Sequence, residues 1–319
     1  MPELFSIALF IIGGLFLLFL GADWLVKGSI TLALHFGLSP LVVGLTVVAL
    51  GTSFPEALVS IQAAIENRGG IALGNVVGSN ILNIALILGI SALFNPLKVD
   101  SHLVKADVPL MAAASFMLIV LLEDFHISRL EGSFLLICIF GYIFGNILTV
   151  KRTSFEENKV SGLEVTNDSR KSFWKDIILL FVGLLALSFG SNLLVDGAVD
   201  LARILGLSEA LIGLTIVSIG TGTPELATAL MAAYRKKSDL AIGNAVGSNL
   251  FNIMFVVGIA ALVSPLDSTG IKESDLYVMM GLSLILLPTV ITGRVIDRKE
   301  GFIFLAIYIG YLFYLWPAM

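Results

Sequence analysis

The chain has few of the features that mark a secreted, redox-active or nucleic-acid-binding protein. It contains a single cysteine, Cys138, which cannot form an internal disulfide. Its three histidines all lie near the ends of apolar segments, and charged residues make up only 13% of the chain, without a basic cluster suited to nucleic acid. We therefore expect no disulfide scaffold, no zinc or copper site and no nucleic-acid partner.

Apolar sequence is abundant instead. Hydrophobic residues make up 57% of the chain and the mean hydropathy is +0.98, which a water-soluble protein of 319 residues could not cover with polar surface. Apolar segments of about 20 residues can cross a bilayer. The sequence thus predicts an all-α polytopic membrane protein, embedded in the lipid bilayer, with ten transmembrane helices. They fall at 3–26, 38–64, 70–94, 106–122, 127–150, 174–199, 207–233, 239–264, 275–292 and 300–316.

A long segment of the chain occurs twice. The stretch Gly37–Leu97 aligns without a gap with Gly206–Leu266, and 28 of the 61 aligned positions are identical. The same register reaches back to two related octamers, GADWLVKG beginning at Gly21 and GSNLLVDG beginning at Gly190. No short motif recurs by accident over such a length, so we infer that one ancestral half was duplicated.

The two copies are expected to be inverted in the membrane. Glu56 on the second span corresponds to Glu225 on the seventh, five crossings later, so equivalent helices must run in opposite directions. This predicts two inverted five-helix repeats, residues 1–150 and 174–319, joined by a polar linker at 151–173. Inverted repeats are typical of secondary transporters that work by alternating access.

The basic residues indicate the orientation of the chain. Of the 19 Lys and Arg residues, fifteen lie in one set of alternate loops, which includes the linker. The other set holds only four, Arg68, Arg129, Arg203 and Lys272. Because cytoplasmic loops carry the excess of Lys and Arg, we expect a cytoplasmic linker, both termini outside and a location in the plasma membrane. The pattern leaves the oligomeric state open, with a monomer as the simplest form.

Each copy places a glutamate in a span that has no Lys or Arg. A carboxylate near the bilayer centre costs at least about 2.5 kcal/mol on insertion scales and usually serves binding or transport. A helix-breaking run precedes Glu56 at 51–55 and Glu225 at 220–224. The break frees backbone carbonyls that a bound cation can satisfy. The alternatives are that the glutamates cap helix ends or pair with buried bases, and that the break is a simple packing kink.

The spans after the two glutamates share the pattern GNxVGSNxxN. On a helix its four-residue steps place three polar side chains of each copy on one face. They are Asn75, Ser79 and Asn83 in the first copy and Asn244, Ser248 and Asn252 in the second. The alternative is ordinary small-residue packing, with Asn and Ser joining neighbouring helices. Opposite two buried glutamates, we interpret this polar face as ligands.

These positions offer hard oxygen donors without sulfur or imidazole. Calcium takes about 6 to 8 oxygens at about 2.3 to 2.6 Å, which two bidentate glutamates, carbonyls near Thr52 and Thr221 and a water would provide. Two carboxylates balance one divalent ion, and sodium ions can neutralise the same pair, so the two cations compete. This chemistry predicts an antiporter that exchanges calcium for sodium. We expect no enzymatic activity and no cofactor, because the ions are the transported substrates.

At these residues the chain resembles the cation/calcium exchanger superfamily, specifically the prokaryotic sodium/calcium exchangers, whose two repeats carry GTSxPE and GSNxxN signatures. The resemblance covers both repeats and all ten spans. It implies that Glu56 and Glu225 are the central ligands of calcium and sodium, and that the first and sixth spans slide as a gate. It also implies flanking sodium sites, lined by Thr52, Ser53, Thr221, Ser79 and Ser248, and ligation by the carbonyls of Ala49 and Ser218.

The chain departs from the family pattern in two ways. Gly222 stands where the first copy has Ser53, so one flanking site lacks a hydroxyl, and Gly222→Ser is expected to lower the sodium concentration needed for exchange. Asn252, like Asn83, stands where some relatives have an acid, which disfavours potassium co-transport. Proton/calcium antiport is the main alternative. A cation channel and an intramembrane acid protease are the rivals from other classes.

Overall fold

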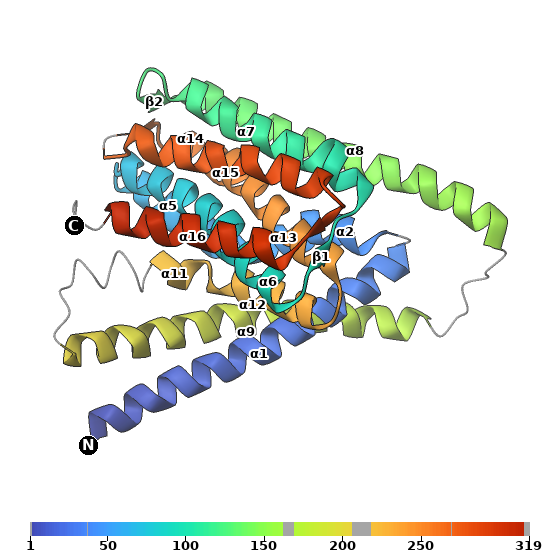
Figure 1. The fold of residues 1–319 in the computed structure, drawn as a ribbon, viewed down its shortest axis with the longest axis horizontal. Helices are drawn as coiled ribbons and strands as arrows, with labels where there is room; N and C mark the ends of the chain where they lie inside the picture. Colours follow the sequence, from blue (N-terminus) through green and yellow to red (C-terminus); the bar gives the residue numbers. More distant parts are fainter. Residues whose placement is uncertain (1, 37, 162–168, 206–217, 269, 316–319) are drawn as a thin grey trace.

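The computed structural model describes the chain apart from residues 1, 37, 162–168, 206–217, 269 and 316–319, and what is described is almost entirely helical (Figure 1). Helices suit a chain in lipid because they satisfy every backbone group within the segment. The elements of the first half are α1 (Pro2–Phe36), α2 (Pro40–Val43), the π-helix η1 (Gly44–Val48), α3 (Ala49–Thr52), α4 (Phe54–Ile65), α5 (Gly69–Leu82), the π-helix η2 (Asn83–Leu88), α6 (Gly89–Phe94), β1 (Leu97–Lys98), the π-helix η3 (Leu103–Asp107), α7 (Val108–Leu121), β2 (His126–Ile127) and α8 (Arg129–Ser161).

The described residues of the second half follow a similar order, except that no π-helix stands between β3 and α15. Its elements are α9 (Ser169–Ile204), α11 (Ser218–Thr221), α12 (Thr223–Tyr234), α13 (Ser238–Leu250), the π-helix η5 (Phe251–Val256), α14 (Val257–Val263), β3 (Leu266–Asp267), α15 (Glu273–Ile291), β4 (Val295–Ile296) and α16 (Arg298–Leu315). Much of the linker predicted at 151–173 is helical, because α8 continues to Ser161 and α9 begins at Ser169. Residues 162–168 of that linker lie outside the described residues.

The described helices confirm the multi-span, all-helical class. Six stretches are long and apolar enough to cross a membrane, and the bent run from Pro40 to Ile65 makes a seventh. The six are Phe5–Phe36, Gly69–Phe94, Leu103–Leu121, Trp174–Ile204, Ser238–Val263 and Glu273–Ile291. The predicted span at 300–316 corresponds to α16, whose first turn carries three charged residues, and the first part of the span at 207–233 lies outside the described residues.

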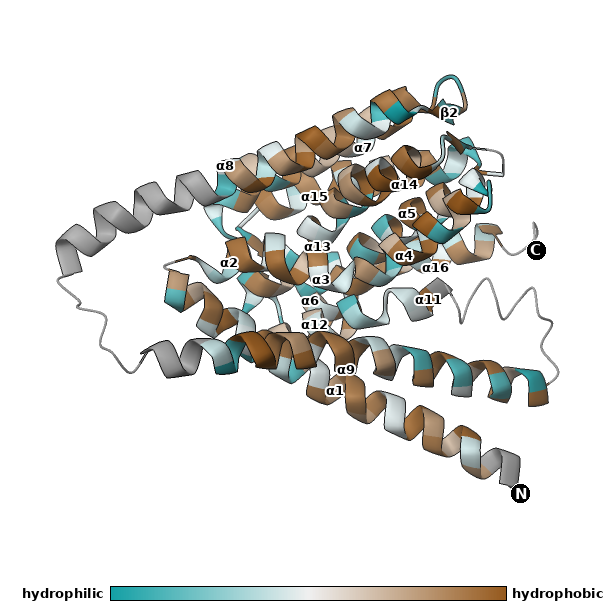
Figure 2. Cartoon of the chain, turned by 180° about the vertical axis from the view of Figure 1, so that it is seen from behind, coloured by the Kyte–Doolittle hydropathy of each residue, from teal (hydrophilic) through white to brown (hydrophobic). Residues whose placement is uncertain are grey.

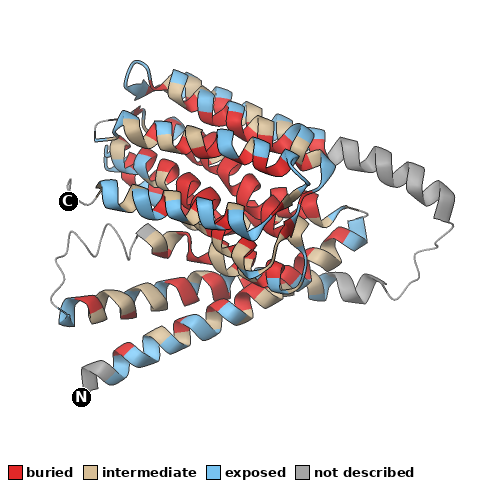
Figure 3. Cartoon of the chain, viewed as in Figure 1, coloured by how far each residue is buried: buried red, intermediate tan, exposed pale blue. Residues whose placement is uncertain are grey.

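The polar interior of the protein is built around α5 and α13. All residues of α13 from Leu240 to Leu250 are buried, and buried residues gather along the middle of the bundle (Figure 3). Hydrophobic residues are frequent along the outer helices (Figure 2), and large apolar side chains such as those of Phe16, Phe140 and Phe181 are exposed. An apolar outside around a more polar centre is the arrangement expected of a bundle in lipid.

The helices α1 and α9 lie side by side along one flank of the bundle (Figure 1). A Cβ added at Gly21 would lie 2.8 Å from the carbonyl oxygen of Gly183, and one at Gly14 would lie 2.8 Å from that of Gly190. Only glycine permits such a close backbone approach. The increasing numbers on α1 pair with decreasing numbers on α9, so these helices are antiparallel. We call this contact the glycine stripe; it consists of Gly14, Gly21 and Gly28 on α1 and Gly183, Gly190 and Gly197 on α9.

Two short antiparallel strand pairs join the halves at opposite ends of the bundle (Figure 1). In one, Leu97 of β1 pairs with Ile296 of β4. In the other, Ile127 of β2 pairs with Leu266 of β3. Applying the repeat register of 169 residues turns Leu97 into Leu266 and Ile127 into Ile296. The two strand pairs are therefore exchanged by the same operation that exchanges the two halves.

Candidate cation site

Glu56 and Glu225 lie in the first turns of α4 and α12, just after the predicted helix breaks. In the first half, α3 ends at Thr52 and α4 starts at Phe54, with a bend of 45° between the flanking segments. Both glutamates are 1% exposed. The N-terminus of a helix carries a partial positive charge and free amides, which favour a carboxylate there. The breaks thus put two carboxylates at buried helix starts.

Hydroxyl groups of the first break reach the second half. The Ser53 hydroxyl donates to Oε1 of Glu225 at 3.5 Å. The Thr52 hydroxyl lies 3.1 Å from Oδ1 of Asn244 and 3.4 Å from the carbonyl oxygen of Ala49, the first residue of α3. Thr52 and Ser53 are both buried. These contacts bring side chains from the second, seventh and eighth predicted spans together, as the ligand hypothesis requires.

Several buried polar atoms around the glutamates have no hydrogen-bond partner in the described part of the chain. In the site itself they are Glu56 Oε2, Glu225 Oε2, Asn244 Nδ2, Ser248 Oγ and Asn252 Oδ1. A buried polar atom without a partner is costly, so such atoms call for an explanation. Four of the five are oxygens, the kind of atom through which a hard cation is bound.

Four asparagines join α5 and η2 of the first half to α13 and η5 of the second half. We call them the asparagine clamp; they are Asn80, Asn83, Asn249 and Asn252. Asn83 Nδ2 donates to Asn249 Oδ1 at 2.9 Å, and Asn252 Nδ2 donates to Asn80 Oδ1 at 3.1 Å. Asn80 and Asn249 each donate to the other's backbone carbonyl at 3.4 Å. The amides of Asn83 and Asn252, both predicted ligands, are thus engaged in the clamp, while Asn252 Oδ1 stays without a partner. The sequence hypothesis did not include Asn80 and Asn249.

The remaining polar residues of the repeated pattern are distributed unequally. Ser248 is fully buried and Ser79 is 8% exposed, and they lie one turn before Asn252 and Asn83 respectively. Asn75 donates to the carbonyl oxygen of Glu56 at 3.2 Å and to the hydroxyl of Ser60 at 3.0 Å. The sequence pattern placed Asn75 on the polar face of its helix, but it did not predict these two hydrogen-bond partners. Asn75 therefore supports the backbone that carries Glu56.

The second helix break has its own backbone contacts. Ser218 and Thr221 are the first and last residues of α11, and Thr221 is half-buried. Nothing is described of the Ser218 side chain, and residues 206–217 before it lie outside the described residues. Ser191 on α9 donates to the carbonyl oxygen of Gly220 at 2.6 Å. At Gly222 an added Cβ would lie 2.7 Å from Cδ2 of Leu82, so the Leu82 side chain occupies the space beside this glycine.

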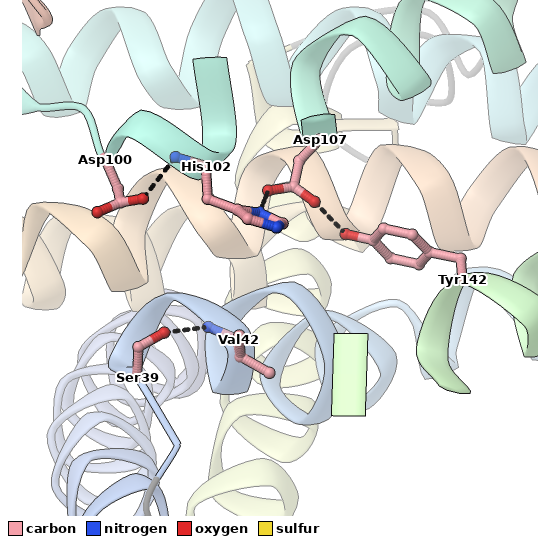
Figure 4. A network of polar contacts seen from close by, with 6 residues as sticks. All are labelled: Ser39, Val42, Asp100, His102, Asp107 and Tyr142. Atoms are coloured by element: carbon pink, nitrogen blue, oxygen red, sulfur yellow. Dashed lines mark hydrogen bonds and ion pairs between the residues drawn. The ribbon is translucent and has the colours of Figure 1, made fainter. Parts of the chain in front are cut away.

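Two polar networks outside the site went unpredicted. Asp23 on α1 forms ion pairs with Lys27 and with Arg235 at the end of α12. At the start of α7, fully buried Asp107 lies 3.0 Å from His102 Nδ1 and accepts from the Tyr142 hydroxyl at 2.9 Å (Figure 4). The second half repeats the latter contact between the Tyr311 hydroxyl and Asp275 at 3.0 Å. The contacts of Asp23 with Arg235 and of Asp107 with Tyr142 join residues far apart in the sequence, so no local pattern predicts them.

The site offers two carboxylates and a shell of neutral oxygens. Among the described residues, no group of three or more His, Cys, Asp and Glu side chains is placed to hold a metal ion. A donor set without sulfur or imidazole suits the hard cations rather than zinc or copper. The donor set therefore fits an ion that is held by oxygen atoms.

The fold and this oxygen-lined site define a multi-span membrane protein of the cation transporter class. The family model for the sodium/calcium exchanger protein matches residues 6–148 and 175–316, so the chain belongs to the sodium/calcium exchanger family. It is 32% identical to sodium/calcium exchanger MaX1 of Methanosarcina acetivorans over 94% of this chain and 95% of that protein. It is also 36% identical to inner membrane protein YrbG of Escherichia coli, over 88% of this chain and 87% of that one.

A solved structure is similar over nearly the whole chain. It is that of the sodium-calcium exchanger NCX_Mj soaked with 10 mM Na+ and zero Ca2+. The match has a TM-score of 0.83 and 34% sequence identity, and it covers 97% of this chain and 98% of that one. The described fold is therefore that of a membrane exchanger.

Proposed function

We propose that the protein is a secondary active antiporter that exchanges Ca2+ for Na+ by alternating access. The observation that carries this function is the pair of buried glutamates, Glu56 and Glu225, which lie at two helix breaks with oxygens that lack a protein partner. Ca2+ and two carboxylates balance in charge, and Na+ neutralises the same carboxylates in a competing state. Membership of the family supports the same pair of ions.

The proposed scaffold is ten transmembrane helices in two inverted five-helix repeats, residues 1–150 and 174–319, with the linker 151–173 between them. Three features support it: the antiparallel pairing of α1 with its counterpart α9, the reciprocal asparagine clamp, and the exchange of the two strand pairs by the repeat register. Inverted repeats allow a fixed central site to open alternately to the two sides.

The ligands divide into a central set and flanking sets in this proposal. Glu56 and Glu225 bind Ca2+ or Na+ at the centre, with help from the carbonyls of Ala49 and Ser218. Flanking Na+ ions use the hydroxyls of Thr52, Ser53, Thr221, Ser79 and Ser248. Asn83 and Asn252 contribute amide oxygens only as far as the asparagine clamp leaves them free, as Asn252 Oδ1 is.

The protein is a multi-pass membrane protein, and we propose that its membrane is the plasma membrane, with the linker in the cytoplasm and both termini outside. The division of fifteen basic residues against four supports this orientation. The name of the relative YrbG, an inner membrane protein, supports the plasma membrane. The lipid bilayer and the two ions are the partners that this function needs.

Proton/calcium antiport is the second candidate, because Gly222 leaves one half without the hydroxyl that Ser53 supplies in the other, and because Asn83 and Asn252 stand where some relatives have an acid. The decisive experiment is uptake of calcium-45 into sealed vesicles with an imposed sodium, potassium or proton gradient. We expect uptake to follow the sodium gradient. If the proton gradient alone drives uptake, the counter-ion is the proton and not sodium. If uptake needs no counter-ion gradient, the protein is a channel.

A further inference from the structure

The hydrogen bond from Ser191 to Gly220 repairs a defect that a proline creates. In a continuous helix the carbonyl oxygen of Gly220 accepts from the amide of residue 224, but Pro224 has no N–H. A buried carbonyl in a membrane protein must then find a donor elsewhere. The buried Ser191 hydroxyl, 2.6 Å away on α9, is that donor. The bond joins α9 directly to the helix break that carries Glu225.

The first half has the same defect without the same remedy. Pro55 removes the amide that the carbonyl of Gly51 would use. By the repeat register, the residue that corresponds to Ser191 is Ala22 on α1, which has no hydroxyl. The chain therefore ties only one of its two helix breaks to the α1–α9 pair through this position.

We propose that Ser191 is a positioning residue: it couples α9 to the Glu225 half of the cation site and stabilises the present conformation over the opposite-facing one. The inference rests on the proposed exchange by alternating access. Because α1 and α9 pack backbone to backbone along the glycine stripe, they move as one body. If that body slides past α11 and α12, a bond of 2.6 Å cannot persist over a displacement of several ångströms.

The inverted arrangement of the two halves also predicts which contact is absent from the opposite-facing conformation. When the two halves exchange their conformations, Ala22 approaches Gly51 as Ser191 approaches Gly220 here. Alanine offers no donor, so that conformation lacks the corresponding bond. The alanine and serine at these equivalent positions thus bias the equilibrium toward the present state.

The test is the apparent affinity for Ca2+ measured separately from each face. The full-length protein is reconstituted in sealed vesicles of uniform orientation, and calcium-45 exchange gives KM and kcat for the inner and the outer face. A typical buried hydrogen bond changes an equilibrium roughly two- to tenfold. Since apparent affinity scales with the population of the competent state, Ser191→Ala should raise KM at one face and lower it at the other within that range.

Matched variants separate coupling from simple damage. Ala22→Ser should shift the two KM values in the reverse directions, and Ser191→Thr, which keeps the hydroxyl, should restore the wild-type values. Ser188→Ala, at a half-buried serine on the same helix, is the control and should change neither. A merely structural role for Ser191 would weaken Ca2+ binding at both faces together.

Unchanged KM values in Ser191→Ala, or shifts in the same direction at both faces, would overturn the proposal. If Ser191→Ala does not fold, Ala22→Ser decides: reciprocal shifts support the proposal, and their absence in a folded variant overturns it. Failure of the proposed function is distinguishable, because wild-type protein would then show no sodium-driven Ca2+ exchange at all.

Discussion

The two central glutamates are equivalent in sequence but not in their surroundings. Glu225 accepts a hydrogen bond from Ser53 of the opposite half. The position that would donate to Glu56 in the same way is Gly222, and the Leu82 side chain fills the space beside it. Glu225 therefore has a hydroxyl partner at this position, whereas the equivalent position of the other half, Gly222, has no hydroxyl to offer Glu56. This asymmetry sets the two predictions at residue scale.

Replacing either glutamate by glutamine should abolish Ca2+ exchange and leave the protein folded. Glu56→Gln and Glu225→Gln each remove half of the charge that balances the ion, while the neutral amide keeps the side-chain volume. Calcium-45 uptake is the measurement, with Glu66→Gln as the control because Glu66 is exposed and paired with Arg68. Near-normal uptake in either site variant would rule out the central role of these carboxylates.

Adding a hydroxyl at position 222 should strengthen sodium binding, provided that the Leu82 side chain moves away from the new side chain. A serine Cβ would meet Leu82 Cδ2 at 2.7 Å, so Gly222→Ser combined with Leu82→Ala should gain more than Gly222→Ser alone. One added ligand is worth about 1 kcal/mol, or several-fold in the sodium concentration for half-maximal exchange.

The control for this pair is Leu82→Ala alone, which adds no oxygen and should not improve sodium use. Calcium affinity should change less than sodium affinity, since both glutamates are untouched. Sodium curves that coincide for the double variant and the Leu82→Ala control would show that position 222 does not face a sodium site.

At residue scale the sequence predicted which side chains are buried and polar, but not all of their partners. A buried carboxylate in an apolar span and a face of Asn and Ser are local patterns. The bonds of Asn80 to Asn249, of Ser191 to Gly220 and of Asp23 to Arg235 join segments that are close only after folding. A single sequence does not show which helix faces contact each other in the folded protein.

At the scale of elements the predicted spans match the helices closely where the ends are sharply polar. The span predicted at 70–94 is the run Gly69–Phe94, and that at 239–264 is Ser238–Val263. The first span was wrong at its end, because α1 continues beyond 26 to Phe36. Lys27 directly follows the predicted end, but Asp23 one turn earlier pairs with it and the helix continues.

The glycine stripe predicts opposite effects for two glycines of one helix. In Gly21→Ala the new Cβ would lie 2.8 Å from the Gly183 carbonyl, so α1 and α9 must separate and the unfolding temperature should fall. In Gly13→Ala no described atom lies within 4 Å, and alanine favours a helix over glycine by about 1 kcal/mol. Thermal unfolding in detergent measures both, and an equal response would argue against backbone packing at the stripe.

The whole molecule combines one symmetric frame with asymmetric details. The strand pairs and the asparagine clamp obey the exchange of halves, whereas Ser191, Gly222 and the Asp23–Arg235 ion pair do not. Symmetric contacts suit the parts that must look alike in both conformations. Asymmetric contacts change their energy when the halves exchange roles, so they set the bias between the two conformations.

The orientation of the whole molecule can be tested at the ends of the bundle. Lys98 in β1 and Asp124 just before β2 are both exposed, and these two strands lie at opposite ends of the bundle. The basic-residue count puts Lys98 and the linker in the cytoplasm and the loop of Asp124 outside. In a background that lacks Cys138, cysteines at Lys98 and within 155–165 should react with an impermeant thiol reagent only in inside-out vesicles, and one at Asp124 only in right-side-out vesicles. The full reverse would invert the orientation, and labelling of Lys98 and Asp124 from the same side would contradict the placement of β1 and β2 on opposite faces of the membrane.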